Sequence, residues 1–509
     1  MRNAKLLVFN TLVLTITGFI MRTISVSFNV YLTNRIGAEG IGLFQLIMTV
    51  YALAVTFAGA GVKLGATRLV SDSLSTGSSD TGKIVKMCIK YSLCAGFSVC
   101  FVLFIFAGVI GEKWIGDLNS VTSLKILSFS LPPISVSAAL NGYFTAKKTV
   151  AKYSSVQLAE QIFKIMLTVA LLGIYGNIGT EYASAAICTG ITAAEIFSAF
   201  VSYIMFVKDR KPSPAKRKSN NLSKLLHIAV PDAVGASFRA VLLTVEHLLI
   251  PKGFTKAGEN SKDSMAIYGT IHGMTLPLVL YPSAVLSALS SLLIGELSRC
   301  VILNDKNKIG FISSTAIKFT LIFSIGISGF MMFFSQTLSI AVYGDTSSAF
   351  YIKIISFLIP VMYTDMITDG LLKGLDQQKA SMRYNIFDSG ICVILVYILL
   401  PVFAVKGYIF ILFLSEIINF ALSINRLIKY AKVEINLMNE IIKPLICAVI
   451  SCAAINILIS YLSVSAKINL LLASLSAFGL YSVMIILTDC ISKKEIKKYK
   501  SLFSKVALD

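Results

Sequence analysis

Residues 6–32 read LLVFNTLVLTITGFIMRTISVSFNVYL, a stretch in which Arg22 is the only charged residue. An α-helix rises 1.5 Å per residue, so ~20 apolar residues cross the hydrocarbon core of a bilayer. The stretch therefore predicts a membrane-spanning helix. Basic residues precede it, as in a signal peptide, but the apolar run is too long for one. We expect a retained first helix.

The same pattern fills the rest of the chain. Of its 509 residues, 56% are hydrophobic and only 14% are charged, whereas a soluble protein has about 25% charged residues. About fourteen apolar runs, separated by short polar breaks, lie between residues 6 and 490. This predicts an all-α, multi-pass membrane protein with about 14 transmembrane helices, and it excludes a soluble enzyme.

The net charge of +20 comes mainly from Lys and Arg residues in the predicted loops and tails. With an even number of helices, 32 of the 46 Lys and Arg residues fall on one side of the membrane and 9 on the other. Cytoplasmic loops carry the excess of Lys and Arg. We therefore expect a cell-membrane protein whose two termini, basic linker 208–223 and basic tail 492–509 are cytoplasmic. The same distribution accounts for the charge without a nucleic-acid partner.

Motifs for catalysis, cofactors and metals are absent from the sequence. The nine cysteines form no CxxC pair, and the three histidines are not clustered. Neither a GxSxG elbow nor a GxxxxGK[ST] phosphate loop occurs. We expect no catalytic residue, no cofactor, no metal and no ATP-driven transport by this chain alone.

The two halves of the chain resemble each other. GFIMR at 18–22 matches GASFR at 235–239, an offset of 217, and at an offset of 228 Pro132 and Gly142 match Pro360 and Gly370. Since the spacing equals six helices, an even number, the repeats run parallel. The predicted organisation has two six-helix lobes and two further helices before the tail, at 1–207, 224–430 and 431–491.

Two parallel lobes that face each other enclose a central cavity, and rocking between them exposes it to either side in turn. This favours an alternating-access transporter. The alternative is that the repeat is a chance similarity between Leu- and Ile-rich helices. Polar residues at matching positions argue against chance.

Polar residues follow one face of the seventh predicted helix, 224–250. Asp232, Arg239 and Glu246 are spaced by seven residues, which places them within about 20° of one another per step. The repeat offset puts a second stripe in the first helix, at Thr15, Arg22 and Asn29.

An ionisable group in the bilayer needs a partner, a wet cavity or a route to the interface. The candidate substrate-binding residues are therefore Arg22, Asn29, Lys63, Arg239 and Glu246. The alternatives are structural ion pairs for the arginines and a side chain that reaches the interface for Lys63.

A second group of acidic residues consists of candidates for gating or coupling. Asp365 and Asp369 lie one turn apart, and Glu160 matches Asp388 at an offset of 228. The group comprises Glu160, Asp232, Asp365, Asp369 and Asp388. The alternative for Asp365 is a contact in helix packing. The alternative for Glu160 and Asp388 is that they cap cytoplasmic loops.

The residues 6–46, ending in IGAEGIGLFQL, and the segment KLGATRLVSDS at 63–73 carry a family resemblance. Together with the helix count and the repeat, they resemble the multidrug/oligosaccharidyl-lipid/polysaccharide exporter superfamily, in particular sporulation proteins of its polysaccharide-exporter branch. The resemblance implies flipping of an undecaprenyl-diphosphate-linked glycan, such as lipid II for spore-cortex peptidoglycan, to the outer leaflet. It implies Arg22 and Arg239 as cavity arginines. The implied partners are the lipid-linked oligosaccharide, membrane lipids and envelope-synthesis enzymes.

Other functions stay open at this point. One is a cation-coupled multidrug exporter, for which Asp232 and Asp365 would supply carboxylates, although Arg22 and Arg239 would repel organic cations. Export of another lipid-linked polysaccharide is a second. A membrane scaffold for envelope enzymes is a third, but it would not require matched buried charges in a repeat.

Overall fold

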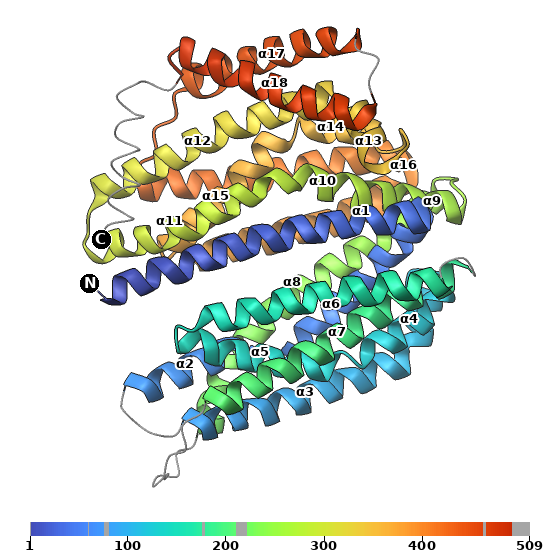
Figure 1. The fold of residues 1–509 in the computed structure, drawn as a ribbon, viewed down its shortest axis with the longest axis vertical. Coiled ribbons are helices and arrows are strands. Elements are labelled where there is room, and N and C mark those ends of the chain that lie inside the picture. Colours follow the sequence, from blue (N-terminus) through green and yellow to red (C-terminus); the bar gives the residue numbers. More distant parts are fainter. Residues whose placement is uncertain are drawn as a thin grey trace. The chain divides into compact units, whose positions relative to one another are not determined.

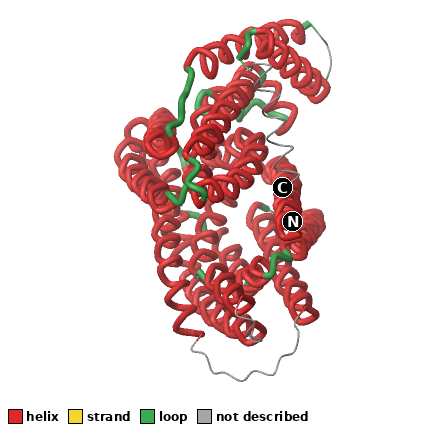
Figure 2. Tube along the Cα trace, turned by 90° about the vertical axis from the view of Figure 1, so that its left-hand side faces the viewer, coloured by secondary structure: helices red, strands yellow, loops and turns green. Residues whose placement is uncertain are grey.

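The computed structural model describes residues 2–59, 61–75, 81–175, 179–209, 221–461 and 465–490. Most of the predicted linker 208–223, and the predicted tail 492–509, lie outside these residues. Every regular element in the described ranges is a helix, with no strand among them (Figures 1 and 2). The all-α class predicted from the apolar runs is confirmed.

The chain contacts divide the described residues into two units. The first, here the N-terminal unit, comprises residues 12–24 and 35–269. Besides most of α1 (Arg2–Gly59) it contains α2 (Val62–Ser75), α3 (Thr81–Val109), the π-helix η1 (Ile110–Ile115), α4 (Asn119–Ser128), α5 (Leu131–Ala146), α6 (Val150–Tyr175), α7 (Thr180–Asp209), α8 (Asn221–Lys256) and α9 (Ser261–Tyr268).

The other unit, the C-terminal unit, comprises residues 1–11, 25–34 and 270–509. It contains most of the π-helix η2 (Gly269–Thr275), then α10 (Leu276–Leu280), η3 (Tyr281–Ser283), α11 (Ala284–Ile302), α12 (Lys306–Phe333), α13 (Ser335–Tyr343), α14 (Ala349–Ser356), α15 (Ile359–Gly374), α16 (Gln378–Ala431), η4 (Met438–Ile442), α17 (Lys443–Ser460) and α18 (Ala466–Leu487).

In the part of the chain that the structure describes, ten helices are long and apolar enough to cross a membrane, or twelve if each of two bent helix pairs is one span. Two of the ten are interrupted. Helix α1 has 58 residues and a break at Gly37 (φ 71°), and α16 has 54 residues and a break at Ala404 (φ 47°). At 1.5 Å per residue both are more than twice as long as a bilayer core. If α1 and α16 each formed two spans, the total would rise from twelve to fourteen. Fourteen is the number predicted from sequence, and it stays a prediction.

The two bent pairs lie at matching places in the repeat. Helices α4 and α5 meet at 43°, and α14 and α15 meet at 60°. In both cases the second helix begins one residue before a repeat-matched proline, Pro132 or Pro360. A proline is tolerated in the first turn of a helix because its missing N–H has no partner there. The sequence repeat thus reappears as a repeated bend.

The matching glycines also have a common structural role. A Cβ on Gly142 would lie 2.6 Å from the Lys63 carbonyl oxygen of α2, and a Cβ on Gly370 would overlap the Ser290 hydroxyl of α11. Each glycine therefore allows close approach between neighbouring helices of its own unit.

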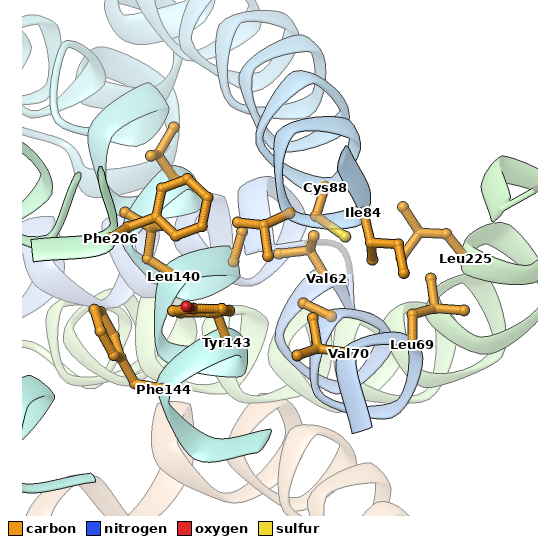
Figure 3. Packing of buried hydrophobic residues seen from close by; sticks show 14 of the residues in the cluster. Val62, Leu69, Val70, Ile84, Cys88, Leu140, Tyr143, Phe144, Phe206 and Leu225 are labelled. Carbon is orange, nitrogen blue, oxygen red and sulfur yellow. The ribbon is translucent and has the colours of Figure 1, made fainter. Parts of the chain in front are cut away.

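A packed apolar cluster holds the helix ends of the N-terminal unit together (Figure 3). Tyr143 of α5 meets Phe206 of α7 edge to face at 5.1 Å between ring centroids. Val62 of α2 lies beside Cys88 of α3 in the same cluster, which also includes Leu225 of α8. Burial of these side chains excludes water from the junction of five helices.

In the C-terminal unit, the two helices predicted to follow the repeat, α17 and α18, pack against α12. The Tyr481 hydroxyl of α18 donates a 2.7 Å hydrogen bond to the Ile322 carbonyl oxygen of α12. Cys447 of α17 joins the same buried cluster.

Candidate functional site

The two predicted arginines lie on α1 and α8, and both belong to the N-terminal unit. Arg22 is half-buried, whereas Arg239 is exposed. Helix α8 begins at Asn221, so Arg239 lies about 27 Å along a helix of 36 residues, at its middle. Glu246, two turns further on, is half-buried.

The predicted stripe of α1 is divided between the units. Asn29 lies in the C-terminal unit, where its Nδ2 donates a 2.5 Å hydrogen bond to the Gly273 carbonyl oxygen of η2. This bond uses the amide to hold a π-helix, in which the backbone hydrogen-bond pattern is irregular. The side chains of Thr15 and Asp232 lie outside the described residues. Lys63 is exposed at the start of α2.

Among the predicted acids whose side chains the structure describes, Asp365 of α15 is the most buried, with 8% of its surface exposed. Its Oδ2 accepts a 3.0 Å hydrogen bond from Nδ2 of Asn419 in α16. Its Oδ1 is buried and has no hydrogen bond within standard limits among the described atoms. The Ser423 hydroxyl of α16 also interacts with this carboxylate.

Two other predicted acids lie near Asp365. The Ser381 hydroxyl donates to Oδ1 of Asp369 at 2.5 Å, and the Ser415 hydroxyl donates to both oxygens of Asp388 at 2.9 and 3.0 Å. Both acids interact electrostatically with Asp365. The structure therefore brings Asp365, Asp369 and Asp388 into one group in the C-terminal unit.

Glu416 completes this acidic group, and the sequence reasoning missed it. It is half-buried and interacts electrostatically with Asp365 and Asp388. The sequence does mark it, since Glu416 is the one charged residue in the otherwise uncharged run YIFILFLSEIINFALSIN at 408–425. We call Asp365, Asp369, Asp388 and Glu416 the acidic group.

A related arrangement occurs between α6 and α7 of the N-terminal unit. Glu160 lies one turn before Lys164, and Glu195 of α7 interacts electrostatically with both. Sequence reasoning singled out Glu160 but not its two partners. At the repeat offset of 228, Cys392 stands in place of Lys164. The two halves therefore share a carboxyl group on the same helix but differ in whether a lysine accompanies it.

At one end of these helices, Asp209 of α7 binds two lysines. It accepts hydrogen bonds from Nζ of Lys147 at 2.6 Å and from Nζ of Lys152 at 2.7 Å, and from the Tyr143 hydroxyl at 3.0 Å. Partial burial lowers the pKa of Lys147, but the hydrogen bonds to Asp209 and Tyr143 outweigh it and raise that pKa above its ordinary value. The lysine therefore stays charged and ties α5 to α7.

No group of three or more His, Cys, Asp or Glu residues in the described ranges is arranged to hold a metal ion. The acidic group is spread along α15 and α16, with a serine or asparagine donor on three of its members. Its chemistry therefore fits a proton or a weakly held monovalent cation better than a transition metal.

The profile of one protein family, described as polysaccharide biosynthesis protein, matches residues 7–293, more than half of the chain. The chain belongs to this family. The chain is 22% identical to stage V sporulation protein B of Bacillus subtilis (strain 168) over 504 residues, which are 96% of each chain. Lipid II flippase MurJ of the same organism is 26% identical over 165 residues, 31% of this chain and 30% of that one.

Proteins of known structure have a similar fold. A structure of lipid II flippase MurJ, in an inward closed conformation, superposes with a TM-score of 0.70 at 15% identity, over 93% of this chain and 98% of that one. The resemblance to the exporter superfamily and to its sporulation proteins is confirmed. This member of the polysaccharide biosynthesis family is a multi-pass membrane protein with a transporter fold.

Proposed function

We propose that the protein is an alternating-access flippase that moves an undecaprenyl-diphosphate-linked glycan from the cytoplasmic to the outer leaflet, with lipid II as the first substrate to test. The names of two relatives, a sporulation protein similar over the whole chain and a lipid II flippase similar over a third of it, support this assignment. Neither relative is a catalytic enzyme by name, which agrees with transport as the activity.

The exposed position of Arg239 is the observation that carries the proposal. A guanidinium that faced hydrocarbon from the middle of a spanning helix would cost at least ~2.5 to 3.5 kcal/mol. The exposed side chain therefore fits a path that water or a polar headgroup can enter. A guanidinium is planar and stays charged, and it binds phosphate oxygens in pairs. Arg239 and its repeat counterpart Arg22 would hold the diphosphate while the polyprenyl tail stays in the bilayer.

The acidic group would couple transport to a cation. Asp365 and Glu416 are carboxyl groups within candidate spans, and such groups mark proton or ion pathways in transporters. Binding of a proton or sodium ion to the acidic group would neutralise it and change the packing of α15 against α16. The lysine at 164 would serve as a built-in cation for the matching acids of the N-terminal unit.

The direct test is flipping by the purified protein in vesicles. The probe is a fluorescent undecaprenyl-diphosphate-linked glycan, and dithionite added outside bleaches only molecules in the outer leaflet. We expect protein-dependent bleaching of the inner pool, and no effect on fluorescent phosphatidylcholine. Equal bleaching of both lipids would contradict a specific flippase. Uptake of a cationic dye, without flipping of the glycan lipid, would favour the multidrug exporter.

A further inference from the structure

An apolar groove opens in the N-terminal unit. Its volume is about 380 Å³. Leu53 and Phe57 of α1 form one wall, Val245 and Leu248 of α8 form another, and Trp114 of η1 closes one end. A volume of this size lies at the lower end of the range for small-molecule sites.

The polar atoms of the groove are few, and its one charged residue is Lys252. The Thr244 hydroxyl donates to the Ala240 carbonyl oxygen of its own helix at 2.8 Å, so it offers little to a ligand. Lys252 lines the groove at the end where α8 finishes. Its Nζ donates a 2.6 Å hydrogen bond to the Lys113 carbonyl oxygen of η1, which uses one of three N–H donors.

This end of the groove has the chemistry of a membrane interface. Trp114 is half-exposed, and tryptophan is enriched where hydrocarbon meets headgroups. Lys256 lies one turn beyond Lys252 and interacts electrostatically with it. Two lysines on one helix end therefore place positive charge beside the mouth of an apolar groove.

We propose that the groove binds one anionic phospholipid, with an acyl chain between α1 and α8 and the phosphate at Lys252. An apolar wall with a cation at one end complements an amphiphile whose charge is negative. The small volume fits a single acyl chain and not the long polyprenyl chain of the proposed substrate. Neither Arg22 nor Arg239 is among the residues that line the groove.

The chain provides its own reporter, since Trp114 is its only tryptophan. The protein is reconstituted in phosphatidylcholine nanodiscs that contain a rising fraction of phosphatidylglycerol or phosphatidylcholine with brominated acyl chains. Bromine quenches tryptophan fluorescence on contact. We expect half-maximal quenching at about a fivefold lower fraction of the brominated phosphatidylglycerol, because one lysine near a membrane surface favours an anionic lipid by about that factor.

Two pairs of variants separate the site from general lipid contact. Lys252→Gln should remove the preference for phosphatidylglycerol, whereas Lys125→Gln, a control lysine over the Phe104 ring, should keep it. Val245→Phe should fill the groove and reduce quenching by both lipids. Val234→Phe, at an exposed position of α8 outside the lining, should not. Equal quenching by the two lipids in the wild type, or an unchanged preference in a folded Lys252→Gln variant, would overturn the proposal.

Discussion

Asn419 of α16 donates a 3.0 Å hydrogen bond to the Asp365 carboxylate of α15, across 54 residues of sequence, and both side chains are buried. The amide satisfies one carboxylate oxygen; the other has no hydrogen bond within standard limits, although the Ser423 hydroxyl of α16 interacts with Asp365. A purely structural pair would satisfy both, because an unpaired buried acceptor destabilises the fold. A role in gating or coupling for Asp365 stays a prediction.

We expect Asp365→Asn to weaken substrate binding much less than Arg22→Ala. An amide keeps the shape and the contact with Asn419, and a carboxylate does not attract a diphosphate, so the change should act on the transport cycle. The measurement is the affinity of purified variants for an undecaprenyl diphosphate, together with the flipping rate. An equal loss of affinity in both variants would make Asp365 a structural partner of the arginines.

Arg22→Lys and Arg239→Lys should each slow transport about tenfold or more, and leave expression and folding nearly normal. Lysine keeps the charge but cannot bind phosphate oxygens in pairs. The assay is rescue of growth in a strain without its own flippase. Arg299→Lys, at an exposed position near the end of α11, is the matched control and should rescue fully. Full rescue by both test variants would return the two arginines to a structural role.

The charge distribution predicts that residue 219 is cytoplasmic and residue 262 is on the outer side. In a background without reactive native cysteines, we expect an impermeant thiol reagent to label Lys262→Cys in intact cells and to label Ser219→Cys only after the cells are broken. Labelling of position 219 in intact cells would show that the predicted orientation in the membrane is wrong.

Asp209→Asn should lower the free energy of unfolding by about 1 kcal/mol, since it removes two partly exposed ion pairs. Because the pKa of Lys147 is raised in the folded state, its contribution is complete at pH values below the ordinary lysine pKa of ~10.4 and is lost only as the pH rises through the higher folded value. Thermal unfolding of the wild type and the variant should therefore differ by the same amount from pH 7 to pH 9. A difference that vanishes within that interval would show that Lys147 does not act as described.

Gly142→Ala and Gly370→Ala should each destabilise the protein by about 1 to 3 kcal/mol, because the added methyl group meets a neighbouring helix. The control is Gly173→Ala in α6, where a Cβ has open space and where alanine is the better helix former. Thermal unfolding in detergent measures all three. Unchanged stability in both test variants would mean that the helix pairs α2–α5 and α11–α15 can move apart at no cost.

The sequence by itself determined the membrane class and the all-α fold, and its repeat singled out the two prolines beside which the structure bends. Each of these depends on local chemistry. An apolar run such as 6–32 has no stable place except in a bilayer or a core, and Pro132 and Pro360 restrict their own helix wherever the chain goes. Hydropathy also separated the apolar runs 6–32 and 41–67, and 383–404 and 407–428, and α1 and α16 break at Gly37 and Ala404, in or beside these gaps.

Only the tertiary structure decided which polar residues meet. The stripe of α1 looked uniform in sequence, yet Asn29 binds the backbone of η2 while Arg22 belongs to the other unit. Glu416 joins Asp365 and Asp388 because α15 and α16 turn these faces toward each other. The physical reason is that spacing along a helix gives the direction of a side chain relative to its own helix, whereas its partner depends on how neighbouring helices are rotated and packed.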